Sequence, residues 1–222
     1  MCGRINLGDL TEEELGAYYG FGIVPERLLE DLPKRWNVPP TSRIPVIRRD
    51  AGGFRLDLAR WGLIPAFFRR PLREWKASSF NARAETVETA ASFRQAYRSG
   101  RALAPAAGFY EWRKAEGGKT PFYLHPGDNA PTLTFAALWS HARLPDFEGP
   151  TCAILTEPAA PDLAWLHDRQ PVMLGPEGVE AWLAGAPVAD VPRLAPDRLA
   201  WHRVRAAVGS VRSKGPELIE PA

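Results

Sequence analysis

The sequence has few of the residues that build disulfide frameworks or zinc sites. Its 222 residues include two cysteines and four histidines, with no C-x-x-C pair and no H-x-x-x-H pair. A disulfide framework uses more cysteines, and a zinc site uses clustered ligands. Glycine-rich phosphate loops and a G-x-S-x-G motif are absent too. We therefore predict neither a metal ion nor another cofactor.

No apolar stretch approaches the roughly 20 residues that a helix needs to cross a bilayer. The start, MCGRINLGDL, also lacks the apolar core of a signal peptide. With so few cysteines, the sequence suits a reducing compartment. We therefore expect a cytoplasmic protein without membrane contact.

The net charge of +2 argues against a general coat for nucleic acids, but basic residues are unevenly spread. Residues 34–73 contain ten Lys or Arg and only two acidic residues, Asp50 and Asp57, an excess of eight positive charges. Such a run is either a solvated face or a surface that binds phosphates.

The pattern of hydrophobic residues predicts an α+β fold. Helices are expected at residues 11–19, 89–99 and 175–185, the first with Thr11 and Glu14 as a capping box. Strands are expected at residues 54–65, 121–125, 133–140, 151–156 and 171–174. Because the strands come in neighbouring runs, we predict a mixed or antiparallel, barrel-like sheet with short helices, in one domain.

Cys2 is the first candidate for chemistry, since removal of Met1 would leave it as the N-terminal residue. An α-amine with a pKa of about 7.7 to 8.0 is substantially neutral near pH 7 to 8 and can attack an aldehyde. The neighbouring thiol can then add to the imine and close a five-membered thiazolidine ring. The alternative is an inert terminal cysteine.

A second candidate is FNARAET, in which Asn81, Arg83 and Glu85 share one side if the segment is extended. An amide beside a guanidinium suits a phosphate or a sugar. The alternative is a turn with a surface ion pair between Arg83 and Glu85.

Two further residues could transfer protons. Glu111 lies among aromatic residues in GFYEW, where burial would suit a general acid, although it could equally be the outward residue of a strand. His167, in LHDRQPVML, could act as acid or base, although a lone histidine is more often structural.

Seven motifs follow one another in the order of one known family. They are MCGR, WNVPPT, WGLIP, FNARAET, GFYEW, LHDRQPV and AVGSVRSKGPELIEP. With this combination the chain resembles the SOS response-associated peptidase (SRAP) family from residue 1 to about residue 221.

The resemblance implies a single SRAP domain over residues 1–222 with a barrel-like β core. It implies a site that binds abasic sites in single-stranded DNA and at its junctions with duplex DNA, and forms a DNA–protein crosslink through Cys2. Asn81 would orient the cysteine amine, Glu111 would promote ring opening and Schiff-base formation, and His167 would handle later proton transfers. Such a protein would be associated with the nucleoid; no protein partner is implied.

The resemblance also assigns the DNA contacts. Arg4 and Arg83 match family positions that grip the phosphates beside the lesion, and Pro40 lies in the matching loop near Cys2. Phe67 and Phe68 occupy the place of aromatic residues that wedge against a neighbouring base.

Three other functions remain open from the sequence. Class II glutamine amidotransferases also begin with Met-Cys-Gly and use a terminal cysteine. The thiol could instead serve a peptidase of the SOS response that removes the protein's own leading residues. A third possibility is a noncovalent binder of single-stranded or modified DNA, in which Cys2 has no role.

Overall fold

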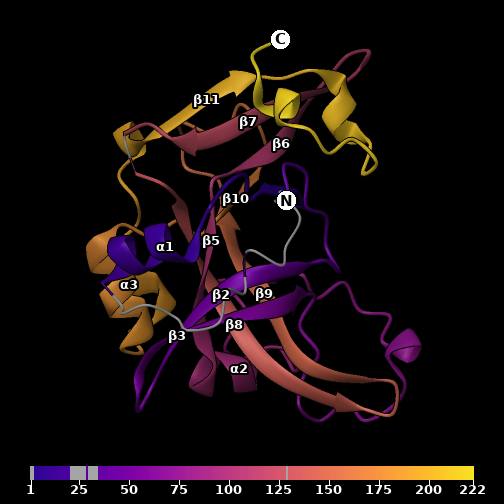
Figure 1. Cartoon of the computed structure of the whole chain (residues 1–222), viewed down its shortest axis with the longest axis vertical. Helices are drawn as coiled ribbons and strands as arrows, with labels where there is room; N and C mark the ends of the chain where they lie inside the picture. The colour runs from indigo at the N-terminus through magenta and orange to yellow at the C-terminus, as the bar shows by residue number, and fades with distance from the viewer. Residues whose placement is uncertain (1–2, 21–28, 30–34, 129) are drawn as a thin grey trace.

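A computed structural model of the chain describes residues 3–20, 29, 35–128 and 130–222 (Figure 1). Cys2 therefore lies outside the described residues. The described chain folds into two β-sheets with short helices around them. No helix in this part of the chain is long and apolar enough to span a membrane.

The larger sheet closes into a barrel. Its barrel strands are β2 (Arg43–Asp50), β3 (Gly53–Trp61), β5 (Arg101–Ala106), β8 (Leu133–Leu144) and β9 (Phe147–Pro158). They pair in the order β9-β3-β2-β5-β8, and a further pairing of β8 with β9 closes the ring. Only β3 and β9 run parallel within the ring. The predicted α+β class with a barrel-like core is confirmed.

Two short strands, β4 (Asn81–Arg83) and β10 (Arg169–Pro171), extend the barrel sheet. Both pair with the last residues of β9, β4 in parallel and β10 in antiparallel fashion. The end of β9 therefore brings two segments together that are far apart in the sequence.

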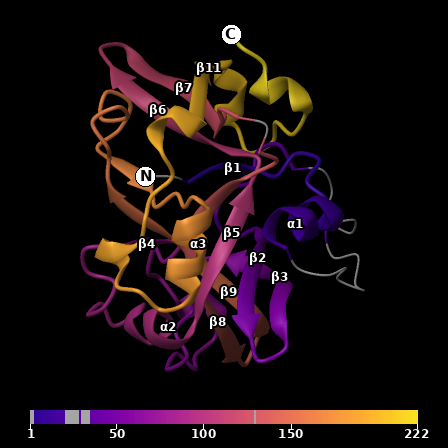
Figure 2. The same ribbon diagram turned by 90° about the vertical axis from the view of Figure 1, so that its left-hand side faces the viewer.

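The second sheet is antiparallel and has the order β1-β6-β7-β11. Its strands are β1 (Ile5–Asn6), β6 (Gly108–Ala115), β7 (Gly118–Pro126) and β11 (Leu199–Arg203). In both views β6, β7 and β11 lie at one end of the molecule, beyond β2 and β3 of the barrel (Figures 1 and 2).

A shared core joins the two sheets. Phe109 and Leu124 from the second sheet pack in one buried cluster with Trp61, Phe135 and Ile154 from the barrel. Successive residues of a strand point to opposite faces. The other faces of the barrel strands therefore enter a second cluster, in which Leu103 and Leu138 pack with helical residues such as Trp182.

The helices are short, and the sequence predicts two of the three well. α1 (Glu12–Tyr19) has the capping box of Thr11 and Glu14 and ends at Gly20, which has a positive φ of 71°. α3 (Pro176–Leu183) also matches. α2 covers only Arg94–Ser99, because the preceding residues form turns. The 3₁₀ helices are Leu72–Glu74, Val188–Asp190, Pro196–Arg198, Ala206–Gly209 and Pro216–Ile219.

The strand predictions are confirmed for β3, β7, β8 and β9, which differ from the expected ranges mainly at their ends. The expected strand at residues 171–174 is largely wrong: β10 ends at Pro171, and Met173 makes only an isolated bridge to Phe135. β2 was not predicted because of its proline. Pro45 has no amide hydrogen to donate, but it lies opposite Leu58 of β3 and has no partner in β5, which pairs with β2 only at Ile47.

Replacing the cap of α1 should destabilise the protein measurably. Thr11 Oγ1 accepts a hydrogen bond from the Glu14 amide, and the Glu14 carboxylate accepts one from the Thr11 amide. Thr11→Ala should lower the free energy of unfolding by about 1 kcal/mol in urea denaturation. Thr11→Ser keeps the hydroxyl and should change it much less; equal losses for both variants would contradict a capping role.

Candidate active site

The first described residues of the chain run between two other segments. Ile5 pairs with Phe109 of β6 on one side and forms a bridge with Val38 on the other. The Tyr110 amide donates to the Arg4 carbonyl over 2.9 Å, and the Val38 amide donates to the Ile5 carbonyl over 2.8 Å. The segment that leads into β1 therefore lies between β6 and the loop that follows Val38.

Glu111 lies on β6, next to this entering segment. Only 6% of the residue is exposed, so the alternative of an outward-facing strand residue is wrong. Its Oε1 accepts a hydrogen bond of 3.1 Å from the Trp112 amide. Its cross-strand partner is Phe122 of β7, and partners in an antiparallel pair share a face. Glu111 is thus a buried acid on an aromatic face.

Asn81 and Arg83 lie on β4, with buried Ala82 between them. The carbonyl of Phe80 accepts hydrogen bonds from Trp61 Nε1 at 2.9 Å and from the Ile154 amide at 3.0 Å, which fixes the start of β4. Asn81 is half-buried and Arg83 is exposed. The two polar side chains therefore share one side of an extended strand, as the sequence predicts.

The ion pair considered between Arg83 and Glu85 is not formed. Glu85 instead binds Arg169, with distances of 2.6 Å from Nη1 to Oε1 and 2.9 Å from Nη2 to Oε2. Arg169 Nη2 also donates to the Thr156 carbonyl over 2.8 Å. This bidentate pair links the segment after β4 to the one that carries His167. Sequence reasoning did not assign Arg169 a role, although it lies in the HDR motif.

His167 has two partners for the same ring nitrogen. Nδ1 lies 2.7 Å from Asp168 Oδ1 and 3.0 Å from the Arg169 amide nitrogen. A protonated Nδ1 can donate to the carboxylate, whereas an unprotonated one can accept from the amide. This nitrogen therefore has a partner whether or not it carries a proton.

Arg4 is held by residues from distant parts of the sequence. Its Nη1 donates to Asn37 Oδ1 over 2.7 Å and to the Val208 carbonyl over 2.9 Å, and its guanidinium carbon lies 5.8 Å from the Trp112 ring centroid. Partial burial lowers the pKa of Arg4. Its Nε is buried without an acceptor among the described residues. A donor without an acceptor suits an anionic ligand.

Asn37 is a residue of this region that the sequence analysis missed. It is 6% exposed, and its Nδ2 lies 2.9 Å from the Ser210 carbonyl and 3.0 Å from the Ser213 carbonyl. It therefore joins Arg4 to the segment after β11. The only signal in the sequence was its place in WNVPPT.

The two neighbouring phenylalanines differ sharply. Phe67 is 61% exposed, whereas Phe68 is 6% exposed and packs on Trp75, with ring centroids 5.0 Å apart. The prediction that both stack on a base is therefore wrong for Phe68, which belongs to a small core with Ile64. Phe67 alone is available. Pro40 is half-buried in the loop after Val38.

The basic run of residues 34–73 is partly neutralised within the β2–β3 hairpin. Arg48 Nε lies 2.6 Å from Asp57 Oδ2, and Arg55 Nε lies 2.6 Å from Asp50 Oδ2. For these residues the interpretation as a solvated, ion-paired face holds. Arg49 and Arg70 pair with two further acids, Glu180 and Glu74, outside the run, which reduces its excess of eight positive charges.

Comparisons with known proteins agree on one family. A family model described as SOS response associated peptidase (SRAP) matches residues 1–211. The chain is 29% identical to the abasic site processing protein YedK of Escherichia coli, over the whole length of both. It is 31% identical to YoqW of Bacillus subtilis over 99% of both chains. It is 30% identical to chicken HMCES over all of this chain and 78% of that protein. Both are also named abasic site processing proteins.

Solved structures show the same fold. A protein of Bacteroides thetaiotaomicron superposes with a TM-score of 0.84 over the whole of both chains at 20% identity. A phage-related protein of Bordetella bronchiseptica has a TM-score of 0.69 at 29% identity, over 92% of this chain and 94% of that one.

The pair of Glu85 and Arg169 predicts a pH-dependent contribution to stability. The hydrogen bond from Arg169 is the main cause that lowers the pKa of Glu85 from 4.5. The contribution is therefore complete above pH 4.5 and is lost as the pH falls below it. In urea denaturation, Glu85→Gln should be less stable than wild type at about pH 7, and the difference should shrink towards about pH 3.

Glu88→Gln is the matched control, because Glu88 is exposed in the same segment. It removes the same charge without touching Arg169. If both variants lose stability equally at neutral pH, the ion pair does not hold the two segments together.

Proposed function

Because the chain belongs to the SOS response associated peptidase (SRAP) family, we propose that it processes abasic sites in single-stranded DNA and at junctions with duplex, by joining to them covalently through Cys2. Its relatives YedK, YoqW and HMCES bear the name of abasic site processing proteins. The proposal treats residues 1–222 as one SRAP domain. The observation that carries it is buried Glu111 beside the segment that leads to Cys2.

The proposed reaction uses both groups of an N-terminal cysteine. The neutral α-amine attacks C1′ of the ring-opened deoxyribose aldehyde, and the carbinolamine loses one water to give an imine. The thiolate adds to the imine carbon and a proton goes to the nitrogen, which closes the thiazolidine. The net change is one new C–N bond, one new C–S bond and one released water. Loss of Met1 must come first, since it frees the amine.

Three side chains have proposed roles in these steps. Glu111 gives a proton to the sugar ring oxygen as the ring opens, and again to the hydroxyl that leaves as water. Asn81 orients the amine from the edge of β4. His167 takes up and returns protons in later steps, including reversal, since its Nδ1 has a partner in either state.

The proposed DNA contacts follow from exposure and charge. Half-buried Arg4 offers its guanidinium to one phosphate, and exposed Arg83 offers its own to another. Phe67 is exposed enough to stack on a base beside the lesion. Pro40 would border the strand near Cys2.

The covalent step can be tested with the chain's two cysteines. Wild type mixed with a single-stranded oligonucleotide bearing one abasic site should give a band that survives denaturing electrophoresis. Cys2→Ala should give no such stable adduct. Cys152→Ala should react like wild type, because Cys152 is fully buried and burial raises the pKa of its thiol.

Two results would overturn the proposal: no stable band with wild type, or the same stable band with Cys2→Ala. The intact mass of the purified protein shows in parallel whether Met1 has been removed. A protein that retains Met1 should not form the thiazolidine.

Glu111→Gln should slow adduct formation by about 10²-fold, because the amide cannot donate an acidic proton. Its affinity for an oligonucleotide with an unreactive tetrahydrofuran analogue of the lesion should stay close to that of wild type. The control is Glu116→Gln, which removes an exposed carboxylate from the turn after β6. Unchanged adduct rates for Glu111→Gln would make its role structural.

A further inference from the structure

Three aromatic side chains outside the residues already assigned form a group at the surface, in which Trp201 is exposed and Phe122 and Trp165 are half-buried. Trp165 and Trp201 have ring centroids 4.7 Å apart, and Phe122 lies 5.0 Å from Trp165 and 6.0 Å from Trp201. We call these three residues the aromatic platform. Trp201 is 48% exposed, although a large aromatic side chain normally gains much by burial. The exposed ring is therefore available to a ligand.

The platform continues the face of the second sheet that carries Glu111. Phe122 is the cross-strand partner of Glu111 on one side and of Arg203 on the other. Trp201 lies two residues before Arg203 on β11 and therefore points to the same side. Trp165 comes from the turn that leads to His167, two residues further on. The platform thus borders the candidate active site from both directions.

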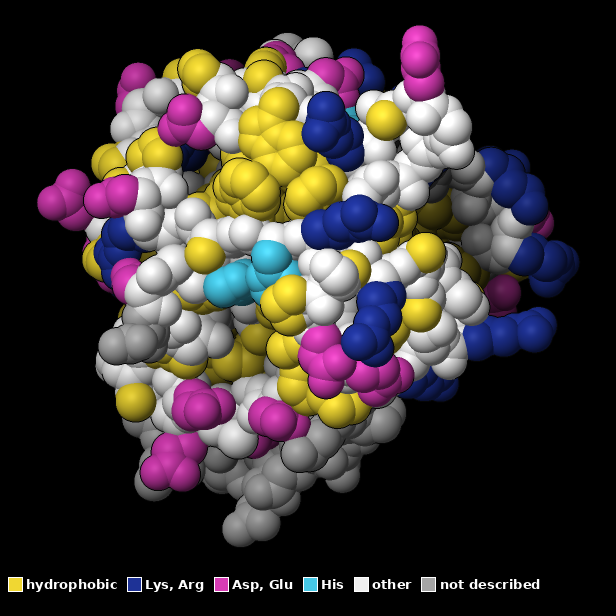
Figure 3. Space-filling view, turned by 90° about the horizontal axis from the view of Figure 1, so that it is seen from above, with side chains coloured by type: hydrophobic (Ala, Val, Ile, Leu, Met, Phe, Trp, Pro, Cys, Tyr) yellow, Lys and Arg dark blue, Asp and Glu magenta, His cyan; other side chains and the backbone are white. Residues whose placement is uncertain are grey.

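Positive charge flanks the aromatic rings. Arg113 lies two residues after Glu111 on β6, and its guanidinium carbon is 5.8 Å from the Trp165 ring centroid. Arg203 is exposed, and neither arginine forms an ion pair within the described residues. Seen from the end that carries β7 and β11, hydrophobic side chains gather on the surface next to Lys and Arg side chains (Figure 3). Aromatic rings beside free cations fit a nucleic-acid strand better than an apolar peptide.

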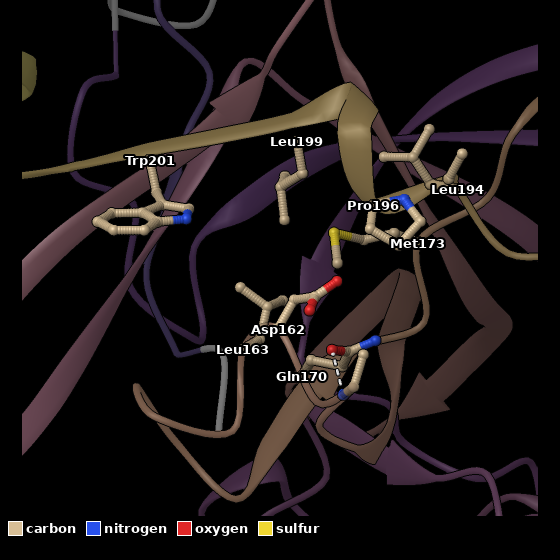
Figure 4. A pocket seen from close by; sticks show the side chains of 10 residues that line it. Asp162, Leu163, Gln170, Met173, Leu194, Pro196, Leu199 and Trp201 are labelled. Carbon is tan, nitrogen blue, oxygen red and sulfur yellow. Dashed lines mark hydrogen bonds between the residues drawn. The ribbon is translucent and has the colours of Figure 1, made fainter.

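A cavity adjoins Trp201 and contains one carboxylate. Its walls include Leu199, Met173 and Asp162 (Figure 4). Asp162 repels a phosphate but can accept a hydrogen bond from the exocyclic amine of a base. The apolar walls also favour a base over the charged backbone. Chemistry on the two sides of Trp201 therefore differs: a base fits at the ring and cavity, and phosphates fit at the arginines.

We propose that the aromatic platform binds one unpaired base of the DNA strand beyond the abasic site, stacked on Trp201, while Arg113 and Arg203 contact the adjoining phosphates. This inference rests on the proposed function and adds to it a subsite for DNA that does not react. Single-stranded DNA is the proposed ligand of the aromatic platform, because arginines flank the rings and because Phe122 shares a sheet face with Glu111. The subsite sets how far the bound strand extends past the lesion.

The experiment measures affinity for single-stranded oligonucleotides that carry the tetrahydrofuran analogue. One extends on both sides of the analogue, and two others stop at it on one side or the other. Trp201→Ala should weaken binding of the long oligonucleotide about tenfold. One of the two shortened oligonucleotides lacks the extension that would reach the platform, and Trp201→Ala should bind this one as tightly as wild type does. Trp201→Phe keeps a ring and should retain most of the affinity.

The charged part of the subsite has its own control. Arg203→Ala should weaken binding of the long oligonucleotide and reduce the salt dependence of its affinity by about one phosphate contact. Arg98 is exposed on α2, and Arg98→Ala removes the same charge there. This variant should change neither the affinity nor its salt dependence. Thermal unfolding shows that each variant is folded before binding is measured.

The outcomes separate this proposal from the proposed function. If wild type forms the stable adduct but Trp201→Ala binds all oligonucleotides as wild type does, the platform does not bind DNA. If Trp201→Ala instead abolishes self-association of the protein, the platform is an interface between copies and the inference is wrong. If wild type forms no adduct, but Trp201→Ala binds the long oligonucleotide more weakly than wild type does, the subsite is supported and the proposed covalent reaction is contradicted.

Discussion

The pairing of β9 is the constraint on which the rest of the structure depends. Residues 147–154 of β9 pair with β8 on one edge, and Thr151 and Cys152 pair with β3 on the other, which closes the barrel. From Ile154 onwards β9 pairs with β4 and β10. β4 carries Asn81, and β10 begins two residues after His167. The first part of β9 thus closes the barrel, and its last residues hold the two strands next to the candidate site residues. β9 itself is held on both edges, whereas β4 and β10 each pair with β9 alone.

The candidate site lies where this barrel meets the second sheet. Glu111 and the entering segment belong to that sheet, whereas Asn81 and His167 belong to the end of the barrel. Their shared core, with Phe109 packed near Trp61 and Phe135, fixes one sheet on the other. The ion pair of Glu85 and Arg169 adds a polar tie within the barrel end. The proposed site therefore draws its residues from two sheets that this shared core holds together.

Local patterns in the sequence predict what depends on neighbours in the chain, and they miss what depends on distant partners. The capping box of α1 and the alternation of β3 involve residues a few positions apart, and both are confirmed. The burial of Phe68, by contrast, depends on Trp75 and on residues of β8 and β9 such as Ala142, while adjacent Phe67 remains exposed. The partner of Glu85 is 84 positions away. Motif matching named the site residues, but only packing distinguishes Phe67 from Phe68.

The hydrogen bonds of Arg4 have a consequence for how the protein is made. Its partner Val208 is 204 positions later in the sequence, and Asn37 bonds the same late segment at Ser210 and Ser213. During synthesis on a ribosome, Arg4 therefore gains its partner Val208 only when almost the entire chain has emerged. The barrel can form earlier, since its strands are complete by residue 158. Newly made chains should therefore contain every barrel strand before Arg4 and Asn37 gain these late partners.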